Sequence, residues 1–342
     1  MSWLVSPRWC KRHSQVNGKL IDRRLQPNLI PPITTVTAAL EYRSKLQELE
    51  PNVNFLMSLY LDDSISPLVV KEAKAAGIAG VKLYASGSTT NAARAVYDFE
   101  PFYPTFAAME EEGIILNLHG EAPSGDSVTV MNAEESFLPH LLEIHQRFPK
   151  LKIVLEHCTT AAAVEAVKSC GATVAATITP HHMLLTIDDV VGDPVNYCKP
   201  VAKSPSDRFA LIHAVVSGNP KFFLGTDSAP HPINAKRTDR TVAGARCAAG
   251  VFTQPYATQL VLTALEEVFE KDGMVPAVTL ESLLGGFLSE YGRRFYGIQL
   301  SKEKIRIQAR KQKVVERFEF ETEATTIVPF WRGASIPTLE WL

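Results

Sequence analysis

Short hydrophobic runs alternate with helical patterns along the chain from about residue 52 onward. Each run is a few residues long and apolar nearly throughout, which is typical of a parallel strand that is covered on both faces. We predict six strands from these runs, at Val53–Leu61, Ile78–Tyr84, Gly113–His119, Leu151–His157, Ala172–Thr179 and Lys221–Asp227.

The segments between these runs predict helices, because apolar residues recur in them at helical spacing and their ends carry start and stop residues. Two segments open with Ser-Pro, at Ser66 and Ser204, and several end at glycine or before proline. The predicted helices are Thr37–Leu49, Ser66–Ala76, Phe102–Glu112, Ala133–Phe148, Thr160–Cys170 and Ser204–Ser217. This alternation predicts right-handed βαβ units and a parallel sheet, which places the chain in the α/β class.

The length of 342 residues suits a single (β/α)8 barrel of the TIM type. A closed barrel needs eight strands, and the pattern yields six. Residues 1–25 show no strand pattern of matching quality, so strands 1 and 2 are predicted to be missing or replaced. We therefore expect a non-matching segment at 1–25 and a barrel domain at 26–342. From about residue 290 the chain includes a Lys/Arg/Glu-rich stretch, Ser301–Glu323, and a proline-containing tail.

The charge balance and the cysteines narrow the class of protein. Lys and Arg number 35 against 37 Asp and Glu, which argues against a nucleic-acid or membrane-surface partner. No apolar run reaches the roughly 18 residues of a membrane span. The five cysteines form no Cys-x-x-Cys pair, which favours a reduced, cytoplasmic setting. The basic N-terminal segment also allows a transit peptide, although it lacks a clear amphipathic period.

Four ionisable residues stand at the ends of four predicted strands: Lys82, His119, His157 and Asp227. In parallel α/β folds the carboxyl ends of the strands meet at one edge, where functional sites lie. Each residue has an ordinary structural explanation, except that a lysine in an apolar strand costs several kcal/mol unless it is paired. Because imidazole and carboxylate are usual ligands of catalytic zinc, the four together favour a metal site.

Six short motifs follow one another between residue 26 and the C-terminus. They are Gln26–Thr35, Val81–Tyr84, Asn117–Glu121, Leu155–Thr160, Ile178–His182 and Gly225–His231. In composition and order they resemble the dihydroorotase family of the zinc amidohydrolase superfamily. Two further segments, Asn132–Glu135 and Asn196–Lys203, look most like the fungal single-function enzymes.

The resemblance implies two zinc ions per chain. Lys82 matches a lysine that is carboxylated on its amine and bridges the two ions, while His119 and His157 match ligands of one of them. Asp227 matches a ligand of the other ion and the general acid/base, which takes a proton from the bridging water and delivers it to the leaving nitrogen. The implied reaction is the reversible cyclisation of N-carbamoyl-L-aspartate to dihydroorotate, a step of pyrimidine synthesis.

The same resemblance implies a set of residues that bind the substrate. Asn28 and His231 would hold its carboxylate, His119 would contact it, and backbone groups near Lys199 and Ala249 would contact the ring. Thr89 and Thr90 match a mobile loop that covers the substrate. A homodimer is compatible with the resemblance. His181 and His182 are predicted to be structural, although a role in orienting ligands stays open.

The chain departs from the family in its first residues. Dihydroorotases open with a strand ending His-x-His-x-Arg, whose histidines bind the second zinc, whereas residues 1–25 contain one histidine, His13. Three explanations stay open: an error in the gene model, a genuine product that cannot turn over substrate, or a rearranged site that uses His13. We predict that the second zinc binds poorly and that the chain as printed is inactive or nearly so.

Two alternatives to a dihydroorotase remain. One is another cyclic amidase, such as a hydantoinase, which the Pro-Asn-Leu-x-Pro-Pro segment and Asp227–His231 argue against. The other is a non-catalytic subunit built on the same barrel, which need not keep zinc.

Overall fold

The computed structural model describes residues 22–24, 27–29, 31–85, 98–237, 247–272, 278–320 and 325–342. The chain divides into two compact units. Unit 1 comprises Met1–Cys158 and Ala162–Thr177, and unit 2 comprises Thr159–Ala161 and Ile178–Leu342. His13, Thr89 and Thr90, which carried predictions, lie outside the described residues.

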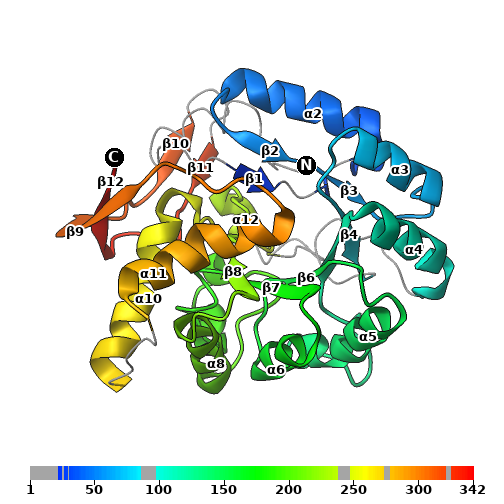
Figure 1. Cartoon of the computed structure of the whole chain (residues 1–342). Helices are drawn as coiled ribbons and strands as arrows, with labels where there is room; N and C mark the ends of the chain where they lie inside the picture. The colour runs from blue at the N-terminus through cyan, green and yellow to red at the C-terminus, as the bar shows by residue number, and fades with distance from the viewer. Residues whose placement is uncertain are drawn as a thin grey trace. The chain divides into compact units, whose positions relative to one another are not determined.

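Unit 1 is built on a parallel sheet of short, buried strands (Figure 1). The strands pair in the order in which they occur along the chain, as βαβ units require. They are β3 (Ser58–Tyr60), β4 (Gly80–Tyr84), β5 (Ile115–His119), β6 (Ile153–Glu156) and β7 (Val174–Ile178). A separate parallel pair joins β1 (Asp22–Arg24) to β2 (Asn54–Leu56).

The helices of unit 1 follow its strands and pack along the sheet (Figure 1). Ser66 caps α3 as its Ser-Pro start predicts, because its hydroxyl accepts a hydrogen bond from the Val69 N–H at 3.4 Å. The helices are α2 (Val36–Leu49), α3 (Pro67–Ala75), η1 (Glu100–Phe102), α4 (Tyr103–Glu112), α5 (Ala133–Arg147) and α6 (Ala161–Ser169).

The register of the sheet sets which side chains lie next to one another. Lys82 on β4 pairs with Asn117 on β5, and His119, the last residue of β5, pairs with Tyr84 on one side and Glu156 on the other. The carboxyl ends of β4, β5 and β6 therefore lie at one edge, and every residue of these strands is buried.

Unit 2 continues the α/β pattern and then changes character. The sixth strand of the sheet, β8 (Phe222–Leu224), follows β7, and the Gly225 N–H just after it donates to the Ile178 carbonyl at 3.2 Å. The helices around it are α7 (Ile187–Gly192), η2 (Pro194–Asn196), α8 (Pro205–Val216) and α9 (Ile233–Lys236). Then come η3 (Gln254–Tyr256), α10 (Ala257–Asp272), α11 (Leu280–Gly285), the π-helix η4 (Gly286–Glu290) and α12 (Tyr291–Tyr296).

The chain ends in antiparallel strands that the sequence analysis did not predict. β9 (Ile305–Lys313) pairs with β12 (Ser335–Trp341), and β10 (Phe318–Phe320) pairs with β11 (Thr325–Ile327). The register between β9 and β12 shifts at Pro337 and Thr338. Because proline lacks the N–H of the ladder, a break at this position is expected.

The α/β class and the predicted elements are confirmed, with two corrections at the N-terminal side. Each predicted strand and helix range contains an observed element. The run Val53–Leu61 is two strands rather than one, since it breaks at Met57, whose carbonyl accepts from the Ala79 N–H at 2.8 Å. Residues 1–25 were expected to hold no comparable strand, yet Asp22–Arg24 forms a three-residue one beside β2.

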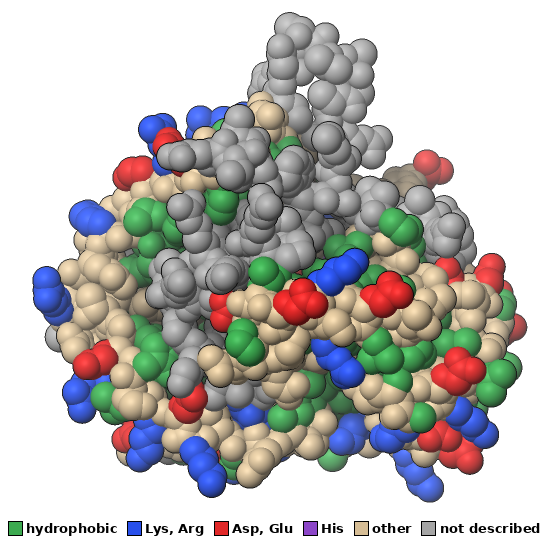
Figure 2. All heavy atoms as spheres, turned by 90° about the horizontal axis from the view of Figure 1, so that it is seen from above, with side chains coloured by type: hydrophobic (Ala, Val, Ile, Leu, Met, Phe, Trp, Pro, Cys, Tyr) green, Lys and Arg blue, Asp and Glu red, His purple; other side chains and the backbone are tan. Residues whose placement is uncertain are grey.

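In the described part of the chain, no helix is long and apolar enough to cross a membrane. On the face in Figure 2, the coloured Lys and Arg side chains are interspersed with Asp and Glu rather than gathered by sign.

Candidate metal centre and substrate-binding loops

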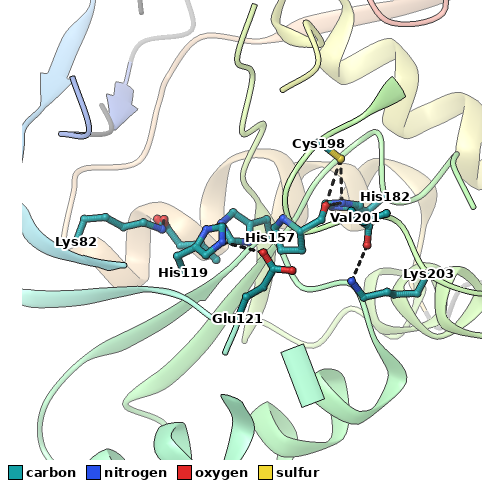
Figure 3. Close-up of polar contacts among 10 residues, drawn as sticks. Lys82, His119, Glu121, His157, His182, Cys198, Val201 and Lys203 are labelled. Atoms are coloured by element: carbon teal, nitrogen blue, oxygen red, sulfur yellow. Dashed lines mark hydrogen bonds and ion pairs between the residues drawn. The ribbon is translucent and has the colours of Figure 1, made fainter. Parts of the chain in front are cut away.

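Lys82, which is labelled in Figure 3, is fully buried and forms an ion pair with Glu156. Its ammonium also lies 4.9 Å from the centroid of the Tyr84 ring. The pairing explains how the lysine side chain is accommodated inside an apolar strand, because a buried charge needs a partner. The sequence analysis missed Glu156, although an acid in an otherwise apolar strand, directly before His157, is itself unusual.

His119 and His157 face each other with their ring nitrogens. His119 Nδ1 lies 3.0 Å from His157 Nε2, and both side chains are buried. The other nitrogen of His119, Nε2, lies 3.0 Å from a carboxylate oxygen of Glu121, which fixes it as the N–H donor (Figure 3). The lone pair of His119 is therefore on Nδ1, the atom that faces His157.

His157 stands on an unusual backbone just after β6. Its φ of 49° lies in the left-handed region, where non-glycine residues are uncommon. The Thr177 hydroxyl accepts a hydrogen bond from the His157 N–H at 2.8 Å, and the Thr177 carbonyl accepts from the Cys158 N–H at 2.9 Å. Strand β7 thus holds the turn that aims the imidazole.

The two imidazoles fit one metal ion. Two nitrogen ligands of a tetrahedral zinc ion lie about 3.4 Å apart, given Zn–N distances of about 2.1 Å. The observed spacing is close to this, and the Glu121 contact is the kind of outer hydrogen bond that fixes the tautomer of a metal-bound histidine. The chain contains no His-x-His that could supply a second such pair for the binuclear site that the resemblance implies.

In unit 2, Asp227 follows β8 by three residues and also has a left-handed backbone, with φ of 42°. Hydrogen bonds tie its loop to the segment at 251–254. The Ala229 N–H donates to the Val251 carbonyl at 2.9 Å, and the Gln254 N–H donates to the Ser228 hydroxyl at 3.0 Å. Asp227 is half-buried, and these hydrogen bonds fix the backbone that carries it.

His231 ends the same loop and contacts Ala249. Its Nε2 lies 2.9 Å from the Ala249 carbonyl and so donates a hydrogen bond to it. Burial lowers the pKa of His231 to about 4, with a further contribution from the nearby Lys236 charge. The imidazole is therefore neutral at physiological pH. Asn28 in unit 1 and Lys199 in unit 2 are half-buried.

Unit 2 also holds His181, His182 and Cys198, whose potential ligand atoms lie within 4.8 Å of one another. Both nitrogens of His182 are engaged, because Nδ1 lies 2.8 Å from the Thr179 hydroxyl and Nε2 donates to the Pro200 carbonyl at 2.9 Å. Figure 3 shows Cys198 beside this ring. A metal ion would have to displace these bonds, so we assign the cluster a structural role.

A parallel α/β sheet with buried imidazoles at the ends of two adjacent strands is typical of amidohydrolases, and the comparisons place the chain in that class. Residues 55–190 match the family model described as Amidohydrolase. The chain is also 52% identical over 307 residues to a probable dihydroorotase of Schizosaccharomyces pombe, covering 90% of this chain and 85% of that protein. The chain belongs to the dihydroorotase family.

The solved structures agree with this assignment. The dihydroorotase of Saccharomyces cerevisiae in complex with 5-fluoroorotic acid has a TM-score of 0.87 and 39% identity, covering 98% of this chain and 94% of that one. An L-hydantoinase of Arthrobacter aurescens has a TM-score of 0.76 at 17% identity and covers 96% of this chain and 76% of that one, so it shares the fold alone. The expected barrel class is consistent with these likenesses.

Proposed function

We propose that the chain is built for the dihydroorotase reaction, the reversible cyclisation of N-carbamoyl-L-aspartate to dihydroorotate. The observation that carries the proposal is the facing pair His119 and His157, with Glu121 fixing the tautomer of the first. This arrangement at the carboxyl edge of a parallel sheet suits a metal-dependent hydrolase of cyclic amides. Its expected setting is the cytoplasm, and a homodimer is compatible with it.

The residues take separate roles in this proposal. His119 and His157 hold zinc, and Lys82, once carboxylated, supplies a further oxygen ligand. When bound, zinc polarises the scissile amide and lowers the pKa of bound water. The Asp227 carboxylate moves the proton between water and the ring nitrogen.

The resemblance to the family also supplies the residues that we propose for substrate binding. Asn28 and His231 bind the substrate carboxylate, His119 contacts the substrate, and backbone groups at Lys199 and Ala249 bind the ring. For Thr89 and Thr90, which lie outside the described residues, the family resemblance implies a loop that covers the substrate.

The chain as printed should turn over little substrate. A second zinc would have only Lys82 and Asp227 as protein ligands, because the histidine pair that completes that site in the family is missing. The loss of two of four protein ligands would cost a second ion most of its affinity, and with it the water activation that the ion would supply.

The test compares the printed chain with a chimera in which a segment ending His-x-His-x-Arg replaces residues 1–25. Both are assayed for dihydroorotate hydrolysis, zinc content and binding of 5-fluoroorotate. We expect the chimera to turn over dihydroorotate with two zinc ions and the printed chain to bind one ion with little turnover. Ordinary turnover by the printed chain contradicts the low-activity claim, and a chimera that hydrolyses hydantoins but not dihydroorotate contradicts the proposed function.

A further inference from the structure

Lys236 is a buried cation whose hydrogen bonds all go to backbone carbonyls. It is the last residue of α9 and is only 4% exposed. Its Nζ donates to the carbonyls of Tyr197 at 2.6 Å, Ala248 at 2.8 Å and Gly250 at 2.8 Å. An ammonium has three hydrogens, so this set uses each of them once.

The burial of a lysine ammonium among carbonyl groups alone is unusual. Burying an ammonium costs several kcal/mol, and the usual compensation is a carboxylate partner. Within the described residues no carboxylate forms an ion pair with Lys236, and three carbonyl dipoles take that place. A charged residue that serves only for stability could be exchanged for an apolar one of similar size at little cost.

The three carbonyls come from two segments that are distant in sequence. The Gly250 N–H donates to the Tyr197 carbonyl at 3.0 Å, and the Ala248 N–H donates to the Ala235 carbonyl at 2.9 Å. Helix α9, the segment around Tyr197 and the segment 248–250 therefore converge on the Lys236 ammonium. These bonds lie within unit 2.

We call the three hydrogen bonds from Lys236 to the carbonyls of Tyr197, Ala248 and Gly250 the clamp. The clamp sets the orientation of Ala249, because this residue lies between Ala248 and Gly250. Because a trans peptide is planar with its C=O and N–H opposed, the Ala248 carbonyl bound to Lys236 makes the Ala249 N–H point away from it. No described residue accepts a hydrogen bond from that N–H. The Ala249 carbonyl accepts from His231, so one residue presents an available donor beside a fixed imidazole.

We propose that Lys236 is a positioning residue, whose ammonium aims the Ala249 peptide and, through it, His231 at the ring and carboxylate of the substrate. The inference rests on the proposed function, which places both groups against the substrate. Lys236 itself does not touch the ligand in this account, and it acts through the two backbone segments that it joins.

The charge of Lys236 matters to this role. Burial lowers its pKa to about 8, so the side chain is mainly an ammonium at neutral pH and keeps all three donors. A neutral amine has two hydrogens and would leave one carbonyl without a donor. The planar fork of an arginine cannot direct three hydrogens at a tripod of carbonyls.

The experiment measures 5-fluoroorotate binding by calorimetry in the full chain and in Lys236→Met, Lys236→Arg and the control Lys203→Met. Lys203 is also a buried lysine of unit 2, and its Nζ donates to the Val201 carbonyl at 2.8 Å (Figure 3). We expect the dissociation constant to rise by about tenfold or more in Lys236→Met, by about threefold or more in Lys236→Arg and by less than about twofold in Lys203→Met. Thermal unfolding of each variant separates lost affinity from lost fold.

Binding within about twofold of the unmodified chain in a folded Lys236→Met variant overturns the proposal. If Lys236→Met does not fold, the same criterion applied to Lys236→Arg decides. If the unmodified chain binds no 5-fluoroorotate, hydrogen exchange of residues 247–254 decides the role of Lys236, and the proposed function fails only if the chimera with the His-x-His-x-Arg segment binds none either. That segment should exchange about tenfold faster in a Lys236 variant than in Lys203→Met, and equal exchange overturns the clamp.

Discussion

His119 Nδ1 and His157 Nε2 point at each other across 3.0 Å from the ends of adjacent strands. Two buried imidazoles in this orientation share one proton at most, and a cation between them satisfies both lone pairs. The geometry of this pair therefore suits the metal ion that the proposed function requires.

We predict that the chain binds one zinc ion per molecule through this pair. His119→Ala and His157→Ala should each weaken zinc binding by more than about 100-fold, whereas His140→Ala, a change at an exposed histidine, should not. Zinc at about 100 times its dissociation constant should stabilise the unmodified protein by about 2.7 kcal/mol, and a chelator should remove this gain. Elemental analysis that finds two tightly bound ions per chain would contradict the prediction.

Glu121→Gln should weaken zinc binding without removing a ligand. The carboxylate holds His119 Nε2 as the N–H donor, and outer contacts of this kind are worth about 10- to 100-fold in metal affinity. Competition with a chromogenic chelator measures the effect. Glu111→Gln changes an exposed acid on α4 and serves as the control, and equal affinities in the two variants would show that Glu121 does not orient the ligand.

Gly250→Ala should destabilise the protein, while Gly192→Ala should be nearly neutral. Gly250 has φ of 144°, and a Cβ there would lie 2.5 Å from the Ala229 carbonyl oxygen, whereas nothing lies within 4 Å of a Cβ on Gly192. Strain and overpacking together should cost about 2 kcal/mol or more, which urea unfolding measures. A Gly250→Ala protein as stable as Gly192→Ala would mean that the contact between the two loops is loose.

The stability of the protein should fall in mild acid because of His231. Its folded pKa of about 4 lies below the unfolded value of 6.5, so the unfolded chain binds the extra proton between these values. The stabilisation is complete above pH 6.5 and is lost as the pH falls towards 4, by up to about 3 kcal/mol. His231→Gln should lack this part of the pH dependence in urea unfolding at pH 7 and pH 4.5. Parallel curves for the two proteins would rule out His231 as the source.

The sequence predicted the strands of the parallel sheet because each is buried on both faces and hence apolar throughout. It did not predict the antiparallel pairs at the C-terminus. Ile305–Lys313 carries so many charged residues that it resembles a solvated segment, and its partner Ser335–Trp341 lies more than twenty residues further on. Pairing between distant, half-exposed strands leaves little trace in local periodicity.

Some residues of the site could also be predicted from the sequence, and others could not. Residues at strand ends could be predicted from position and chemistry, as His119 and His157 were. Lys236 could not, because Asn234-Ala235-Lys236-Arg237 resembles an exposed helix end. Its burial depends on carbonyls 12 to 39 residues away, which only the folded chain brings together.

The left-handed turn at His157 restricts which side chains evolution or design can place there. Asparagine and aspartate tolerate that backbone, while cysteine and glutamate would pay for it in conformational energy. His119, on an ordinary strand, carries no such restriction. A change of metal preference in this scaffold is therefore more accessible through position 119 than through position 157.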